Sequence, residues 1–218
     1  MVKLLLGISV LYGLWISAAA MAGENSGVYI FGAVGQSQLK SVKSDQTALD
    51  AQLTAAGATG VSSSTNDNQD AYSLFLGYQF NRKWAIEGGY VDIGTTNYSA
   101  QGSAGAVAGT ASLSNKYDAA SLTAVRTWNV PDNFGNNGFS FLAKFGIARV
   151  RSSPSGSVTI PGIVLTSQSD AKNGITFGLG ARYDFDQNWA IRADADSYDT
   201  GQSVGRLPVY TLGLSYKF

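Results

Sequence analysis

The last twelve residues of the chain, 207–218, constrain its fold more than any other stretch. From Tyr210 onward, apolar or aromatic residues occupy every second position, and small or polar residues lie between them. These apolar positions are Tyr210, Leu212, Leu214, Tyr216 and Phe218. A period of two places the two kinds of residue on opposite faces of a β-strand. Termini of soluble domains usually fray into water, so this pattern favours a strand between lipid and a polar lumen.

The N-terminal stretch has the features of a secretory signal peptide. Lys3 is the only charge before Glu24, residues 4–16 are largely apolar, and Ala20-Met21-Ala22 fits a small-x-small cleavage site. We expect residues 1–22 to be removed and residues 23–218 to form the mature domain. The alternative is an anchoring helix, but the apolar run is shorter than the ~20 residues that a membrane span needs.

The composition excludes several classes of function. Without Lys3, 14 basic residues remain against 15 acidic ones, which gives no electrostatic basis for binding nucleic acid. The chain has no cysteine and no histidine. Thiol chemistry and histidine-based general-base catalysis therefore cannot be built, and a catalytic zinc site would depend on carboxylates alone. We expect no enzyme activity, no catalytic residue, no metal site and no cofactor.

The alternating pattern recurs along the mature chain and predicts eight strands. They lie near residues 27–34, 71–80, 84–90, 117–128, 139–148, 175–184, 189–196 and 207–218. Single-chain bacterial barrels have an even number of antiparallel strands. The predicted fold is therefore all-β: an eight-stranded antiparallel up-and-down transmembrane β-barrel, with a short helix in its first extracellular loop.

The connections between these strands are short and long in turn. The expected turns are 81–83, 129–138 and 186–188, and the expected loops are 36–70, 95–115, 152–171 and 199–206. Short turns lie in the periplasm and long loops outside the cell, which places both termini in the periplasm. In the first loop, Ser44 and Asp45 before Leu49 and Leu53, with Gly57 after them, predict the helix. In the third loop, residues 157–160 and 163–166 could pair as a small hairpin.

Two hairpins repeat each other and predict charged contacts in the lumen. Residues 78–87 match residues 183–192 at an offset of 105, which brings Glu87 and Arg192 to the same height on opposite strands. Three-residue turns would also place Gly77 opposite Glu87 and Arg182 opposite Arg192. Two facing guanidiniums repel and cannot lose their charge, so carboxylates must converge on them. The predicted lumen network comprises Glu87, Lys144, Arg182, Asp184, Arg192 and Asp194.

Within this network we expect Glu87 to bind Arg192, Arg182 or Lys144 and to block the lumen. The alternative is that lumen water solvates each charge separately. On the outer surface, Arg149 shares the outward phase of residues 139–147 and lies roughly 25 Å above the base, at ~3.3 Å per residue and a ~40° tilt. Arg151 lies just beyond it. Because the guanidinium fork suits phosphate, both are candidates for contacts with lipopolysaccharide; the alternative is a simple charged rim.

These residues resemble the OmpA-like family of outer-membrane barrels over about residues 27–218. The likeness rests on residues 210–218, which resemble the family's C-terminal assembly signal, on residues 80–90 and on the Lys144-Phe145-Gly146 run. It implies a monomeric barrel in the outer membrane, inserted by the barrel assembly machinery, with an interior closed by side chains and a charged network. No peptidoglycan-binding domain follows the barrel, so a wall-anchoring role is not expected.

Two functions remain open from the sequence. The first is a structural or surface-interaction role of the adhesion type, in which the extracellular loops bind a host or surface ligand. The second is a pore of small conductance for ions or small solutes. The expected partners are outer-membrane lipid, lipopolysaccharide and the assembly machinery. An eight-stranded barrel is about filled by its own side chains, which favours the first function.

Overall fold

A computed structural model describes most of residues 23–218. The described residues are 26–38, 47, 50–51, 54–55, 58–65, 68–104, 107–130, 138–159, 169–199 and 205–218. The expected signal peptide, residues 1–22, lies outside them. No helix among the described residues is long and apolar enough to cross a membrane.

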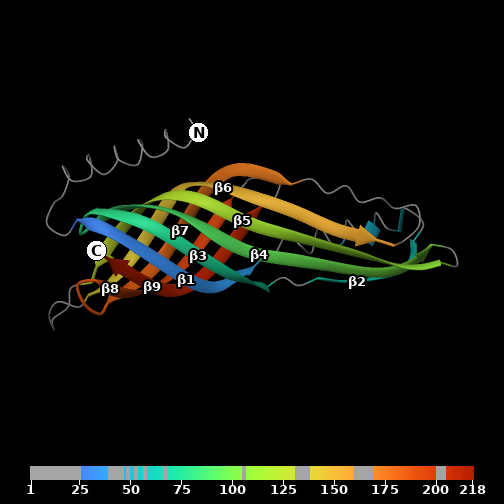
Figure 1. Ribbon diagram of the computed structural model, residues 1–218, viewed down its shortest axis with the longest axis horizontal. Helices are drawn as coiled ribbons and strands as arrows, with labels where there is room; N and C mark the ends of the chain where they lie inside the picture. The colour runs from blue at the N-terminus through green and yellow to red at the C-terminus, as the bar shows by residue number, and fades with distance from the viewer. Residues whose placement is uncertain are drawn as a thin grey trace, which may run out of the picture.

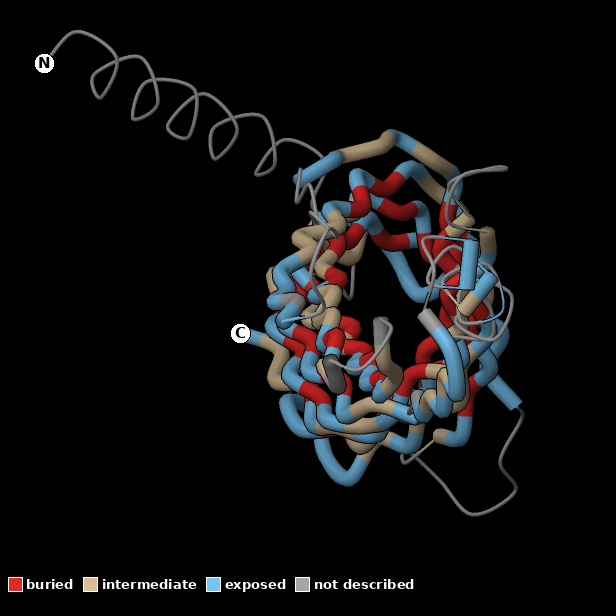
Figure 2. Tube along the Cα trace, turned by 90° about the vertical axis from the view of Figure 1, so that its right-hand side faces the viewer, coloured by how far each residue is buried: buried red, intermediate tan, exposed pale blue. Residues whose placement is uncertain are grey.

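The described residues form nine strands in one antiparallel sheet. They are β1 (Gly27–Gln38), β2 (Ala58–Thr65), β3 (Asn68–Asn81), β4 (Trp84–Ala104), β5 (Val107–Asn129), β6 (Phe139–Val158), β7 (Asp170–Asp184), β8 (Trp189–Asp199) and β9 (Arg206–Lys217). Their order is β2-β4-β3-β1-β9-β8-β7-β6-β5, and pairing of β4 with β5 closes the ring. Eight of them, all except β2, form the barrel, which confirms the predicted fold class; Figure 2 shows the closed ring.

The barrel wall is apolar outside because every second residue of each strand points outward. Leu76, Phe145 and Leu179 are among the large hydrophobic residues exposed there, at 60–68%. A belt of exposed aromatic side chains surrounds the end that carries the short turns: Trp84, Trp128, Phe139, Tyr183, Trp189 and Phe218, with the half-buried Tyr216 between the rings of Trp189 and Phe218. The guanidinium of Arg126 lies in this belt, 5.0 Å from the Trp84 ring and 5.6 Å from the Trp128 ring. Such a belt is typical of a membrane–water interface.

Both ends of the barrel domain lie beside the short turns. β1 pairs with β9, with Ile30 opposite Tyr216 and Val34 opposite Leu212. The Phe218 amide donates to the carbonyl oxygen of Val28 at 3.0 Å, and the Lys217 amide donates to that of Asn188 at 2.8 Å. The C-terminus therefore lies next to the β7–β8 turn (Figure 1).

At the opposite end, four strands continue far beyond the rest of the barrel (Figure 1). We name this part the extension sheet: β2, residues 95–104 of β4, residues 107–116 of β5 and residues 152–158 of β6. The expectation that 95–115 is a loop is therefore wrong, as it is for 58–65 and 152–158. Both faces of these segments are rich in Ser, Thr, Asn, Gly and Ala, so the apolar alternation that lipid imposes on one face of a strand does not mark them as strands. Cross-strand hydrogen bonds join them, such as Ser114 Oγ to Asn97 Oδ1 at 3.0 Å.

A β-bulge at Gly94 marks the point where β4 leaves the barrel. The register shifts between Asp92 and Gly94 on this strand, and Gly94 has a φ of 108°. A side chain there would also place its Cβ 2.5 Å from Cβ of Gln69 and 2.9 Å from the carbonyl oxygen of Asp70. Only glycine meets both demands without strain.

Two smaller expectations concern the loops. Of the segment 44–57, the structure describes Thr47, Asp50, Ala51, Thr54 and Ala55, which are helical, and the Thr54 hydroxyl donates to the Asp50 carbonyl oxygen at 2.8 Å. The rest of that expected helix lies outside the described residues. The expected hairpin in the third loop is corrected in its first half, because Ser157 and Val158 pair with Ser112 and Ala111 of β5. Residues 160–168 are not described.

Candidate functional site in the barrel interior

A buried ion pair joins opposite walls of the barrel. Glu87 on β4 is fully buried, and Arg192 on β8 is 3% exposed. Arg192 donates from Nη1 to Oε1 of Glu87 and from Nη2 to Oε2 at 3.1 Å. The Tyr29 hydroxyl donates to Oε1 at 2.7 Å. Of the three partners that the sequence left open for Glu87, the structure therefore places Arg192 against it, at the offset of 105 residues that the hairpin repeat gives.

Arg192 binds a second carboxylate on its own strand. Its Nε donates to Oδ1 of Asp194 at 2.9 Å, and its Nη2 lies 2.9 Å from Oδ2. The guanidinium also lies 4.5 Å from the centre of the Phe31 ring. One arginine thus connects two carboxylates and an aromatic face, which compensates for the cost of removing its charge from water.

Lys144 on β6 extends the network along β8. Its Nζ donates to Oδ2 of Asp194 at 2.8 Å and to Oδ2 of Asp196 at 2.6 Å, and it lies 5.3 Å from the centre of the Phe75 ring. Lys144 therefore does not compete for Glu87. Asp196 is a member that the sequence prediction omitted, although it continues the inward alternation of Arg192 and Asp194.

The buried network comprises Glu87, Lys144, Arg192, Asp194 and Asp196. It carries three acidic and two basic groups, and Oδ1 of Asp196 has no hydrogen-bond partner among the described residues. Arg182 and Asp184 form a separate, partly exposed pair, with Nε to Oδ1 at 2.7 Å. Arg182 does lie opposite Arg192, as Gly77 lies opposite Glu87, and each arginine has carboxylates of its own.

Inward-facing glycines make room for these contacts. A Cβ at Gly178 would lie 2.0 Å from Oδ1 of Asp196, and one at Gly180 would lie 2.3 Å from Oδ1 of Asp194. Gly178 on β7 lies in register between Lys144 on β6 and Asp196 on β8. The lysine side chain therefore crosses above a residue that has no side chain. The inward Thr176-x-Gly178-x-Gly180 spacing is the sequence feature that marks this space.

Apolar layers flank the network, and the pattern of inward charges does not predict these layers. One cluster of buried residues includes Phe31, Phe75, Val91, Ile93, Tyr198, Leu207 and Val209. A second comprises Tyr29, Ala85, Val125 and Leu142. The Phe31 and Phe75 rings stack with centroids 6.2 Å apart. The barrel interior is therefore a packed core around an ion network, and Figure 2 shows buried segments around the ring.

The two predicted lipopolysaccharide residues lie on the outer surface of β6. Arg149 and Arg151 are both exposed. Arg149 faces Ala120 of β5 and Asn173 of β7, and Arg151 faces Asp118 of β5. The structure places neither of them near the buried network. Among the described residues, no group of three or more metal-ligating side chains is arranged to hold a metal ion.

A family of known proteins matches nearly the whole chain: the family described as outer membrane protein beta-barrel domain matches residues 8–218. No protein with a curated description matches the sequence.

Three solved structures are also similar in fold. The N-terminal β-barrel domain of Pseudomonas aeruginosa OprF shares 14% identity, covers 88% of this chain and 98% of its own, and has a TM-score of 0.48. OprG from the same organism shares 16%, covers 88% and 93%, and has a TM-score of 0.48. Ail, the attachment invasion locus protein of Yersinia pestis, shares 15%, covers 88% and 99%, and has a TM-score of 0.46 in its complex with the heparin analogue sucrose octasulfate.

Proposed function

Because the chain belongs to the outer membrane protein β-barrel family, we propose that it is a closed outer-membrane barrel that carries an interaction surface outside the cell. The short turns and both termini lie in the periplasm, and the extension sheet projects from the outer leaflet. The observation that carries this proposal is the contrast between a packed interior and a long external sheet. A rigid scaffold that presents an exposed surface is a common basis of binding.

One face of the extension sheet suits contact with an uncharged polar surface. Its exposed side chains are hydroxyls and amides: Asn97, Ser99, Gln101, Thr110, Ser112, Ser155 and Ser157. Cross-strand bonds hold several of them in place, such as Ser112 Oγ to Ser157 Oγ at 3.4 Å. On the other face Tyr98 is buried, and its hydroxyl donates to Oδ1 of Asp50 from the first loop at 2.6 Å. The hydroxyl face is thus the free face of the described sheet.

A shortened hairpin tests this role. Tyr98 and Leu113 are partners in register, so replacing residues 99–112 with Asn-Gly, a favoured two-residue hairpin turn, removes the tip of the sheet and leaves the barrel intact. Cells displaying the shortened barrel should adhere less to host-cell layers and to abiotic surfaces than cells displaying the full chain. Equal amounts of heat-modifiable barrel in the outer membrane provide the control. Unchanged adhesion would contradict the proposed role.

A pore is the alternative, and the packed interior argues against it. Glu87, Phe31, Ile93 and Leu207 are each 0% exposed, so side chains fill the path that ions would need. An enzyme is argued against by the sequence, which has no histidine and no cysteine. We therefore place the function of this protein on its outer surfaces.

The C-terminal alternation also supports a role in assembly. Tyr210, Leu212, Leu214 and Phe218 are exposed on the outer wall, and the ring of Phe218 contacts that of Tyr216 with centroids 5.0 Å apart. We expect the barrel assembly machinery to read this apolar face. Deleting Phe218 should reduce heat-modifiable barrel in the outer membrane, with Phe218→Tyr as the conservative control. Normal insertion of the deletion variant would remove the support for this signal.

A further inference from the structure

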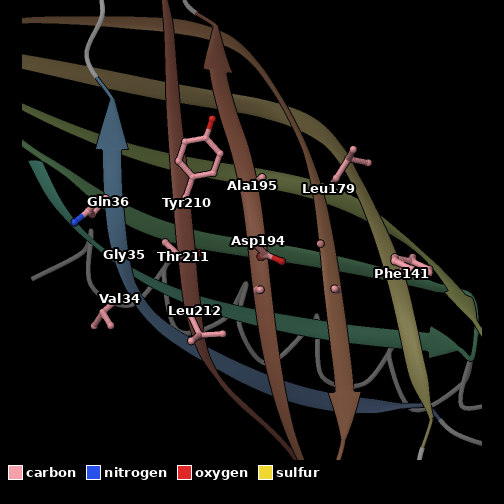
Figure 3. Close-up of a pocket in the computed structure, with 13 residues that line it drawn as sticks. Val34, Gly35, Gln36, Phe141, Leu179, Asp194, Ala195, Tyr210, Thr211 and Leu212 are labelled. Atoms are coloured by element: carbon pink, nitrogen blue, oxygen red, sulfur yellow. The ribbon is translucent and has the colours of Figure 1, made fainter. Parts of the chain in front are cut away.

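The outer wall of the barrel has a shallow, open depression that crosses β8 and its neighbouring strands. A groove of about 650 Å³ lies there, and Figure 3 shows side chains that line it on neighbouring strands. Its floor is made of the small residues Ala181, Ala193 and Ala195, and its sides are formed by Tyr210 and Leu212 on β9 and Leu179 on β7. In register, Ala195 lies between Leu179 and Tyr210. The groove is therefore a depression in the surface that faces lipid.

Beyond the lining of the groove, the outward face of β8 stays small toward the outer end of the barrel. The next outward residue of β8 is Ser197, which is again small and lies between Pro208 and Phe177. Beyond it, Asp199 is paired in register with Arg206, the first residue of β9. Arg206 is four residues above Tyr210, which is roughly 13 Å at ~3.3 Å per residue. An acyl chain is long enough to cover this distance along the wall, whereas a headgroup alone is not.

Basic side chains lie at the outer end of this wall. Nε of Arg206 lies 3.2 Å from Oδ2 of Asp199, and its guanidinium lies 5.6 Å from the centre of the Phe177 ring. The Arg206 side chain is still 70% exposed, so its remaining donors face outward. Arg149 and Arg151 on β6 are exposed at the same end of the same wall. Asp118 of β5 lies opposite Arg151 in register, so three arginines face two aspartates here and the rim keeps a small positive charge.

We propose that the β6–β9 wall binds one phosphoglycolipid of the outer leaflet, of the lipid A type. One acyl chain lies in the groove over Ala193 and Ala195, and the phosphates meet Arg206 and Arg149. The apolar groove excludes a charged occupant, and the arginine rim favours an anion next to it. An amphiphile with phosphates meets both demands, with its acyl chain in the groove and its phosphates at the rim. This inference rests on the orientation given under the proposed function and extends the role expected for Arg149 and Arg151.

The experiment uses the folded mature chain in detergent micelles. Native mass spectrometry measures how much hexa-acylated lipid A with two phosphates, or the same lipid without phosphates, stays bound. Ala195→Phe fills the groove and should lower retention of both lipids about tenfold, which corresponds to losing the burial of about two methylenes. Arg206→Gln should lower retention of the phosphorylated lipid alone, about fivefold, as expected for one arginine near an anionic surface.

Two variants on other parts of the wall are the matched controls. Ala124→Phe fills an exposed small position on β5, and Arg126→Gln removes the arginine of the opposite belt; both should bind each lipid as the unchanged protein does. Equal retention in all variants, or equal losses in the controls, would overturn the proposal and indicate only a general lipid layer. The shortened β4–β5 hairpin should retain the lipid in full, so the adhesion proposal and the lipid proposal fail separately.

Discussion

At the scale of single residues, Arg192 connects the two sides of the barrel interior. It binds Glu87 on the opposite wall and Asp194 on its own strand. Asp194 also receives Lys144, so removing one charge affects every other member of the buried network. A buried charge that loses its partner is destabilising because nothing replaces the water that it gave up on folding.

Glu87→Ala should lower the free energy of unfolding by ~3–5 kcal/mol. Arg192→Glu should lower it further, because it adds a carboxylate between Glu87 and Asp194. The double change Glu87→Arg with Arg192→Glu should recover part of the loss, but not all of it, since Asp194 then faces the new carboxylate. Denaturant unfolding in lipid vesicles, followed by tryptophan fluorescence, measures the series. A double variant no more stable than the singles would argue against the pairing.

Gly178→Ala should destabilise the barrel by ~1–3 kcal/mol, the usual cost of overpacking. The new Cβ would lie 2.0 Å from Oδ1 of Asp196 and 3.0 Å from Cε of Lys144, and would push the two charges apart. Gly32→Ala is the matched control, because a Cβ there meets nothing within 4 Å. The same unfolding assay compares the two. If both variants unfold alike, the space above Gly178 does not matter for the network.

Four members of the buried network, Glu87, Lys144, Arg192 and Asp194, could be expected from sequence, with Arg192 as one of three partners open to Glu87. The bonds that Lys144 makes could not. The hairpin repeat sets the height of both residues, and strand order sets them on opposite walls. Which carboxylate Lys144 binds depends on the space above Gly178 and Gly180, which becomes visible only when β6, β7 and β8 are in register. A list of inward charges does not contain that information.

At the scale of elements, the strands that cross the lipid layer are readable from sequence, and their extensions are not. Lipid on one face forces apolar residues onto every second position, as in β3 and β9. In the extension sheet, residues 95–104 and 107–116 lack this alternation and combine backbone pairing with small polar side chains, which also suit a loop. The short turns are partly predictable from sequence, because specific side chains close them.

The turn between β7 and β8 should respond to pH. The Asp186 carboxylate accepts the amide N–H groups of Asn188 at 2.8 Å and Trp189 at 2.7 Å, and these bonds lower the pKa of Asp186 below its ordinary value. A carboxyl group with a lowered folded-state pKa stabilises the turn above its unfolded pKa. That contribution is lost as the pH falls through the folded pKa. Carboxyl NMR titration in micelles should show this low pKa.

Asn81 gives the matched comparison for that turn. At the equivalent position of the β3–β4 turn, its Oδ1 accepts the amides of Lys83 at 2.8 Å and Trp84 at 3.1 Å, and an amide does not titrate in this range. Asp186→Asn should therefore keep the β7–β8 turn and remove its acid sensitivity. An ordinary pKa for Asp186, or an acid response that persists in Asp186→Asn, would show that these bonds do not control the turn.

At the scale of the whole molecule, the barrel divides its roles between an inner core and two outer surfaces. The buried network and the apolar clusters close the interior, and we propose that the extension sheet faces the outside of the cell and that the β6–β9 wall binds lipid. Closure was expected from strand number and inward charges. The apolar layers were not, because alternation puts Phe31 and Phe75 on the inner faces of their strands, but only the strand register shows that their rings stack on one another.

Single-barrel conductance in planar lipid bilayers tests the closed interior most directly. The unchanged protein should show no stepwise current, because the ion network and the apolar clusters leave no continuous path for water. Glu87→Ala should remain closed as well, since Phe31, Ile93 and Leu207 stay in place above it. Discrete, reproducible conductance steps from the unchanged protein would contradict the account and favour the pore.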